Sequence, residues 1–273
     1  MSNLSPASPI GPLSVGNVVS AGVRIYRSHL KQYFKLSIRA SLWSIVPIYG
    51  WAKSTEIAGA IARLAYSELI DKPETVTDAR RHTSPLLWQF FVTGLLIALI
   101  SVGLFVGLGI GFSLIVGVGA VAVSTSPPLA PLAAILGIVA FIAALIVLIR
   151  FSSRLFVYDL PMAIEDNIDS TTSISRSWSL TKGAVGRIQW ILVVAFLITL
   201  LVYLPAIALS GTASFLAIND PSSGLLYLIQ LVDLVVRIVL TAFIMPYWQV
   251  IKAVVYYDLR ARREGLGLQL RDR

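Results

Sequence analysis

The sequence contains no cysteine and has few charged residues. Asp, Glu, Lys and Arg make up 13% of its 273 residues, whereas hydrophobic residues make up 56%. Soluble globular domains carry roughly a quarter of their residues as charged types. The lack of cysteine excludes disulfides and cysteine-ligated metals, and the two histidines, His29 and His82, are too few for a conventional zinc site. A mean hydropathy of +0.81 indicates a membrane protein.

The patterns of familiar catalytic sites are also missing. The sequence has no HExxH motif, no clustered carboxylates at metal-ligand spacing and no G-x-S-x-G turn that could serve either histidine. A glycine pattern over 117–122 resembles the dinucleotide-binding motif, but it lies inside an apolar segment rather than at a water-accessible strand-to-helix turn. We therefore predict no catalytic residue, no cofactor and no metal.

Long apolar segments predict an all-α, polytopic membrane helical bundle with about six transmembrane helices. About 20 helical residues cross a hydrocarbon core of about 30 Å. The expected crossings are 36–52, 55–70, 86–123, 129–157, 188–216 and 225–257. The first two are short and contain charged residues. If they form one interfacial excursion, four crossings fit the sequence equally well.

These crossings are expected to form a single membrane domain over 14–268. Ser and Pro are frequent in 1–13, which predicts a disordered tail, and 269–273 form a basic C-terminal tail. Ser14 is a candidate N-cap for a helix whose apolar residues recur at helical spacing. We expect this amphipathic helix to lie on the cytoplasmic surface, and packing on the protein's own loops is the alternative.

The distribution of Lys and Arg predicts the orientation. The first 55 residues carry no Asp or Glu but several Lys and Arg, and the segment between the fourth and fifth crossings is also basic. By contrast, the short loops at 124–131 and 219–224 contain no Lys or Arg. By the positive-inside rule, both termini face the cytoplasm.

Basic residues next to the crossings are candidates for contact with anionic headgroups on the cytoplasmic face. They are Arg24, Arg27, Lys31, Arg260, Arg262 and Arg263. The last three directly follow a crossing, where anionic lipid supplies the opposite charge. We therefore expect membrane lipids, and no nucleic acid, as their partner.

A helix capped by Asp169 or Ser170 is expected between the fourth and fifth crossings, with Gly183 ending it. Arg176, Trp178 and Lys182 lie on this helix. They form an expected interfacial elbow, with the tryptophan at the level of the lipid headgroups. A connector that locks the two crossings together is favoured over a ligand site.

Two patterns lie within the expected crossings. Gly103, Gly107 and Gly111 share one helix face, which lets another helix approach closely. We expect this face to pack against the segment 129–157, and homodimerisation is the alternative. Asp233 and Arg237 are spaced i,i+4 in the last crossing and are predicted to form an intramembrane ion pair. A role in helix packing is favoured over a substrate or proton pathway.

Three segments of the chain resemble a known family. They are 246–265 (PYWQVIKAVVYYDLRARREG), 176–183 (RSWSLTKG) and 21–27 (AGVRIYR). They resemble the membrane domain associated with glycerophosphoryl diester phosphodiesterases, which occurs fused to a catalytic barrel or alone in multi-spanning bacterial proteins. The resemblance implies a six-helix domain in a bacterial cytoplasmic (inner) membrane. It implies no phosphodiesterase activity, because the barrel would need roughly 200 further residues.

The sequence therefore predicts a non-catalytic scaffold or accessory subunit that binds membrane lipids and protein partners in a membrane complex. The first alternative is a transporter or channel component that uses Asp233 and Arg237. The second alternative is a lipid-processing enzyme.

Overall fold

The computed structural model describes residues 14–219 and 224–265, and within these ranges all regular secondary structure is helical. The expected tail over 1–13 and the basic tail over 269–273 lie outside the described residues. The all-α class predicted from the apolar segments is confirmed for the described part of the chain.

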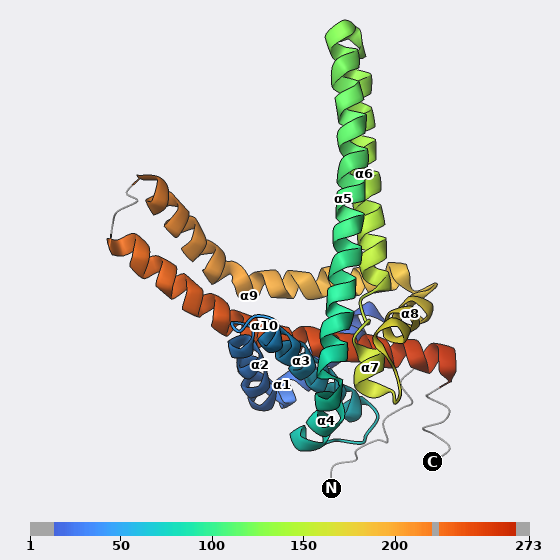
Figure 1. Ribbon diagram of the computed structural model, residues 1–273, viewed down its shortest axis with the longest axis vertical. Coiled ribbons are helices and arrows are strands. Elements are labelled where there is room, and N and C mark those ends of the chain that lie inside the picture. The colour runs from blue at the N-terminus through green and yellow to red at the C-terminus, as the bar shows by residue number, and fades with distance from the viewer. Residues whose placement is uncertain (1–13, 220–223, 266–273) are drawn as a thin grey trace.

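Six short helices and parts of the long helices form a packed base. Figure 1 shows this base below the hairpin of α5 and α6. The short helices are α1 (Val15–Ser28), α2 (Leu30–Trp43), α3 (Tyr49–Leu69), α4 (Val76–Thr83), α7 (Leu160–Ile164) and α8 (Ser170–Thr181). They pack around the C-terminal half of α10 (Gly224–Glu264), whose Ile251 and Tyr256 are fully buried with Ile61 of α3. Burial of these apolar side chains stabilises the base.

Two long helical hairpins extend from the base. The first joins α5 (Leu87–Thr125) to α6 (Ala130–Arg154) through the 3₁₀ turn η2 (Pro127–Leu129), and the second joins α9 (Val185–Asn219) to α10. A 3₁₀ turn, η1 (Ser84–Leu86), connects α4 to α5. Four helical segments, which contain α5, α6, α9 and α10, are long and apolar enough to cross a membrane.

The first two expected crossings fall in the base. The range 36–52 is wrong as a single crossing, because α2 ends at Trp43 and a non-helical turn precedes α3. The range 55–70 lies almost wholly in α3, but neither helix is among the four long apolar segments. More than half of α3 is buried against other helices, including the carboxylate of Glu56, which is 0% exposed. Internal ion pairs and small side chains therefore place α3 inside the base.

Helix α1 begins where the sequence predicts. The Ser14 hydroxyl accepts a hydrogen bond from the backbone N–H of Asn17 at 3.2 Å, which caps the helix. Its apolar stripe packs on α10, and a Cβ added to Gly22 would lie 2.5 Å from Cδ1 of Ile251. The apolar face thus contacts the long helices α10 and α9 rather than loops, while Arg24 remains exposed.

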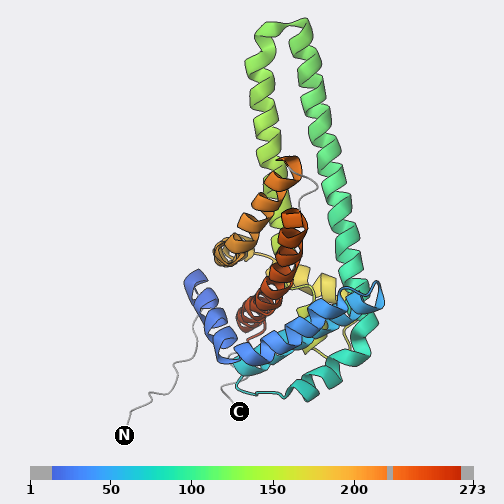
Figure 2. The same ribbon diagram turned by 90° about the vertical axis from the view of Figure 1, so that its left-hand side faces the viewer.

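The α5–α6 hairpin is held together differently from the expectation. A Cβ added to Gly103, Gly107 or Gly111 would meet no described atom within 4 Å, so the predicted packing of this face on α6 is wrong. Figure 2 shows α5 and α6 diverging toward the base, and midway along the hairpin Phe112 meets Phe141 with ring centroids 6.2 Å apart. The close approach occurs near the turn, where a Cβ on Gly119 would lie 3.3 Å from Cβ of Ala133. The glycine face of α5 is therefore open to its surroundings.

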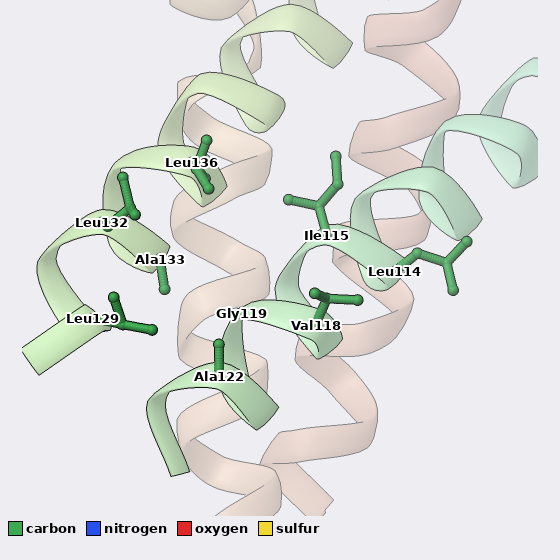
Figure 3. Close-up of a pocket in the computed structure, with 9 residues that line it drawn as sticks. All are labelled: Leu114, Ile115, Val118, Gly119, Ala122, Leu129, Leu132, Ala133 and Leu136. Carbon is green, nitrogen blue, oxygen red and sulfur yellow. The ribbon is translucent and has the colours of Figure 1, made fainter. Parts of the chain in front are cut away.

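A cavity of about 370 Å³ lies between α5 and α6 beside this contact. Figure 3 shows its lining residues, whose side chains contain only carbon. Such a lining offers no hydrogen-bond donor or acceptor from a side chain, so it suits apolar atoms alone.

Helices α9 and α10 each contain an internal proline. Pro205 and Pro246 lack the backbone N–H that would continue the helical hydrogen-bond ladder, and proline rings bend helices. Figure 1 shows both helices changing direction between the base and the outer part of the hairpin. The hairpin therefore leaves the base in a different direction from α5 and α6.

Candidate functional site

The α9–α10 hairpin contains a cluster of polar side chains outside the base. Nε of Arg237 donates to Oδ2 of Asp233 at 2.7 Å, one helical turn away on α10. Ser210 of α9 joins them, because its hydroxyl lies 3.3 Å from Oδ1 of Asp233 and accepts a hydrogen bond from the Arg237 guanidinium. The ion pair is thus bonded across the hairpin, and it links α9 to α10.

The base contains a second polar network, centred on Arg176 of α8. Its guanidinium lies 3.1 Å from Oε1 of Glu165 and also contacts the carboxylate of Glu264 at the end of α10. Burial lowers the pKa of Arg176, but its hydrogen bond and its proximity to these two carboxylates outweigh that effect, so the pKa is raised. Arg176 therefore stays charged. Its contacts with Glu165 and Glu264 show that it points into the base, which corrects its predicted place on the interfacial elbow.

Arg260 occupies the other side of this network. Its Nε donates to Glu264 at 2.8 Å, and its guanidinium lies 5.8 Å from the ring centroid of Tyr256. Nη1 also donates to the hydroxyl of Tyr66 on α3 at 3.3 Å. The charge of Arg260 is thus largely satisfied inside the protein by Glu264 and aromatic side chains, and its contact with lipid headgroups stays a prediction.

The remaining elbow residues face outward and lie apart. Asp169 caps α8 by accepting from the backbone N–H of Thr172 at 2.9 Å, as the sequence predicts. Trp178 is 44% exposed, and the guanidinium carbon of Arg154 lies 4.7 Å from its ring centroid. Lys182 follows the last residue of α8. Because Arg176 contacts carboxylates of the base while Trp178 is exposed, the structure does not bring Arg176, Trp178 and Lys182 into one site.

Lys182 instead belongs to a basic cavity of about 270 Å³ between the start of α9 and the end of α10. Arg187, Arg262 and Arg263 also line it. Asp258 forms ion pairs with Arg187 and, at 3.0 Å, with Arg262. This convergence of positive groups suits an anion.

A larger polar cavity, of about 580 Å³, lies beside the turn between α7 and α8. Its lining includes Arg81, His82 and Glu165, so positive and negative groups are mixed. His82 lies 3.8 Å from Asp166, which is highly exposed. The residues that the structure describes contain no group of three or more His, Asp or Glu placed to hold a metal ion.

Sequence reasoning missed the acidic members of these networks. Glu165 lies 11 residues from Arg176 and 91 from Tyr256, so spacing alone gives no signal for it. Arg260 and Glu264 are four residues apart on one helix, and so are Asp258 and Arg262. That spacing could have shown that acidic residues of α10 itself partly neutralise the positive charges at its C-terminal end.

Comparison with known proteins gives a family without an assigned function. A family model described as a domain of unknown function, DUF7847, matches residues 64–259. Neither the curated proteins nor the solved structures give a significant match. The resemblance to the phosphodiesterase-associated membrane domain gains no support from this match. Because the match covers more than half of the 273 residues, the chain belongs to the DUF7847 family.

Proposed function

We propose that this protein is a non-catalytic scaffold or accessory subunit of a membrane assembly. The observation that carries the proposal is the exposure of the most apolar part of the first hairpin, since no residue of the most apolar 18-residue window in either segment is buried. Transmembrane helices associate by close packing of small residues rather than by a hydrophobic driving force. The open face of Gly103, Gly107 and Gly111 supports binding of a partner helix there.

The same proposal places the base and both termini in the cytoplasm of a bacterial inner membrane, with four crossings. Helices α2 and α3 then form the interfacial excursion. The turn between them is apolar and exposed, and the ring centroid of Tyr49 lies 5.6 Å from Trp43 and 6.5 Å from Trp88 at the start of α5. Aromatic side chains favour the headgroup level, which supports placing this turn where α5 enters the membrane.

The absence of cysteine makes the topology directly testable, because each introduced cysteine is the only one in the chain. A membrane-impermeant maleimide added to intact cells should label Ser126→Cys and Asn219→Cys at the hairpin ends. It should label Lys72→Cys in the base only after permeabilisation. Ser54→Cys separates the alternatives, because it lies between the expected crossings 36–52 and 55–70 and is exposed outside with six crossings but not with four.

The scaffold role is tested with a matched pair of variants on α5. Gly107 and Gly109 are both exposed, and a Cβ added at either position would meet no described atom within 4 Å beyond the adjacent backbone of its own helix. They lie on opposite sides of the helix. Gly107→Leu should abolish co-purification of a stoichiometric partner in mild detergent, whereas Gly109→Leu should retain it. Recovery of a lone monomer from the unmodified protein would refute the scaffold.

The second candidate is a transporter or channel component, and the intramembrane ion pair favours it. Such a role needs a polar path that reaches Asp233. Five cavities among the described residues are lined by neither Asp233 nor Arg237. The cross-helix bond to Ser210 favours the packing role instead.

A further inference from the structure

The basic cavity at the junction of α8, α9 and α10 has a defined geometry. The chain leaves α8 at Lys182 and turns sharply at Gly183, whose φ of +81° is a conformation that glycine adopts readily. The Arg263 guanidinium donates a hydrogen bond to the carbonyl oxygen of Lys182, across this turn. It would lie 3.7 Å from a Cβ at position 183, so the turn and the end of α10 are in close contact. The cavity walls are therefore fixed by two separate segments.

Positive charge predominates in this cavity. Four lining side chains, those of Lys182, Arg187, Arg262 and Arg263, carry a positive charge, and Asp258 is the carboxylate bonded to two of them. Among the described residues, no ion pair joins Lys182 or Arg263 to a carboxylate. Both side chains are exposed. The first turn of α9 also contributes, because the N-terminus of a helix carries a partial positive charge and favours anions.

The position of the cavity indicates where the anion comes from. The charge-free part of α9 begins at Ile188, directly after Arg187. Trp190 is 65% exposed there, and Trp178 is exposed on the preceding helix. Tryptophan favours the headgroup region of a bilayer. The basic cavity therefore lies at the depth of lipid phosphates, if α9 crosses as proposed above.

We propose that this cavity binds the phosphodiester group of an anionic phospholipid, with Lys182 and Arg263 as its accessible cationic contacts. The inference rests on the proposed membrane placement of α9 and deepens it by naming a lipid site. A lipid with a net negative charge is favoured over a zwitterionic one, because the cavity carries excess positive charge. Arginine adds planar, paired N–H donors that match phosphate oxygens.

Native mass spectrometry of the full chain tests this site. The protein is purified in an uncharged detergent, stripped of lipid, and titrated with phosphatidylglycerol or with phosphatidylcholine of the same acyl chains. Tight binding of one phosphatidylglycerol is expected, with phosphatidylcholine binding much more weakly. The double variant Lys182→Gln/Arg263→Gln should bind phosphatidylglycerol about tenfold or more weakly, since each of the two basic groups near an anionic headgroup contributes about fivefold.

Two controls keep the test decisive. Lys72→Gln removes one exposed positive charge from the turn after α3, away from the cavity, and should bind as the unmodified protein does. Lys182→Gln alone is included in case the double variant does not fold, because it changes only one exposed side chain. This single variant should also weaken binding of phosphatidylglycerol.

Three results would overturn the proposal: unchanged phosphatidylglycerol binding in a folded double variant, equal binding of both lipids, or displacement of phosphatidylglycerol by an equal concentration of inorganic phosphate. The last would assign the cavity to free phosphate. Because the titration is done in detergent, its failure is distinguishable from a failed topology, which the cysteine labelling reports.

Discussion

Removing the carboxylate of Glu56 should destabilise the base strongly. Glu56 is fully buried on α3, and its Oε2 lies 2.7 Å from Nζ of Lys53. Its Oε1 accepts hydrogen bonds from the hydroxyls of Thr83 at 2.9 Å and Ser84 at 3.3 Å. Glu56→Ala therefore removes an ion-pair partner, empties a buried volume and leaves two hydroxyls without their acceptor.

The magnitude follows from the burial. Breaking a buried ion pair by removing one partner costs about 3–5 kcal/mol. For a domain of this size, that corresponds to a fall of roughly 6–20 °C in Tm. Thermal unfolding in a mild detergent, followed by intrinsic tryptophan fluorescence, measures the shift. Glu56→Gln keeps the shape and an acceptor oxygen, so its Tm should fall between those of Glu56→Ala and the unmodified protein.

Glu68→Ala is the matched control on the same helix. Glu68 is partly exposed and lies 3.3 Å from His29. Exposed pairs contribute only about 0–1 kcal/mol, so the Tm of this variant should change little. If Glu56→Ala lowered the Tm no more than Glu68→Ala, the carboxylate would not be held in a buried network, and the assignment of α3 to the base would be refuted.

Three further outcomes are expected. Arg237→Leu leaves the Asp233 carboxylate without its cation in the hairpin, at a cost of about 3 kcal/mol, so the folded yield in membranes should fall; a normal yield with lost solute flux would favour the transporter. Gly50→Ala would drive a methyl group into a backbone carbonyl at the end of α2, and its Tm should fall by the equivalent of about 1–3 kcal/mol. Hydrogen bonds from Thr172 hold the pKa of Asp169 below its usual range. The cap therefore stabilises the fold above the ordinary aspartate pKa, and this contribution is lost as pH falls through the lowered value. Unfolding midpoints across acidic pH should consequently vary less in Asp169→Asn.

Local signals in the sequence predicted local features well. Ser14 and Asp169 cap the helices expected of them, because an N-cap needs only a side-chain oxygen and the next turn of backbone. The long apolar segments likewise predicted the helices of both hairpins, although α5, α9 and α10 extend beyond the expected limits.

Features that depend on distant partners could not be predicted in this way. Arg176 and Arg260 follow the pattern of lipid-facing cations, and only the folded chain brings Glu165 and Glu264 beside them. The 55–70 segment is apolar enough to suggest a crossing, but the partners of Glu56 on α4 and η1 hold α3 in the base.

The two internal prolines have a mechanical consequence. Pro205 and Pro246 weaken the backbone ladder of α9 and of α10 between the base and the polar cluster of Asp233, Arg237 and Ser210. The cluster links the outer halves to each other, so we expect bending at the prolines to move both halves together, like a lever. A thicker or thinner bilayer would then be accommodated by the angle of this lever, with no rearrangement of the base.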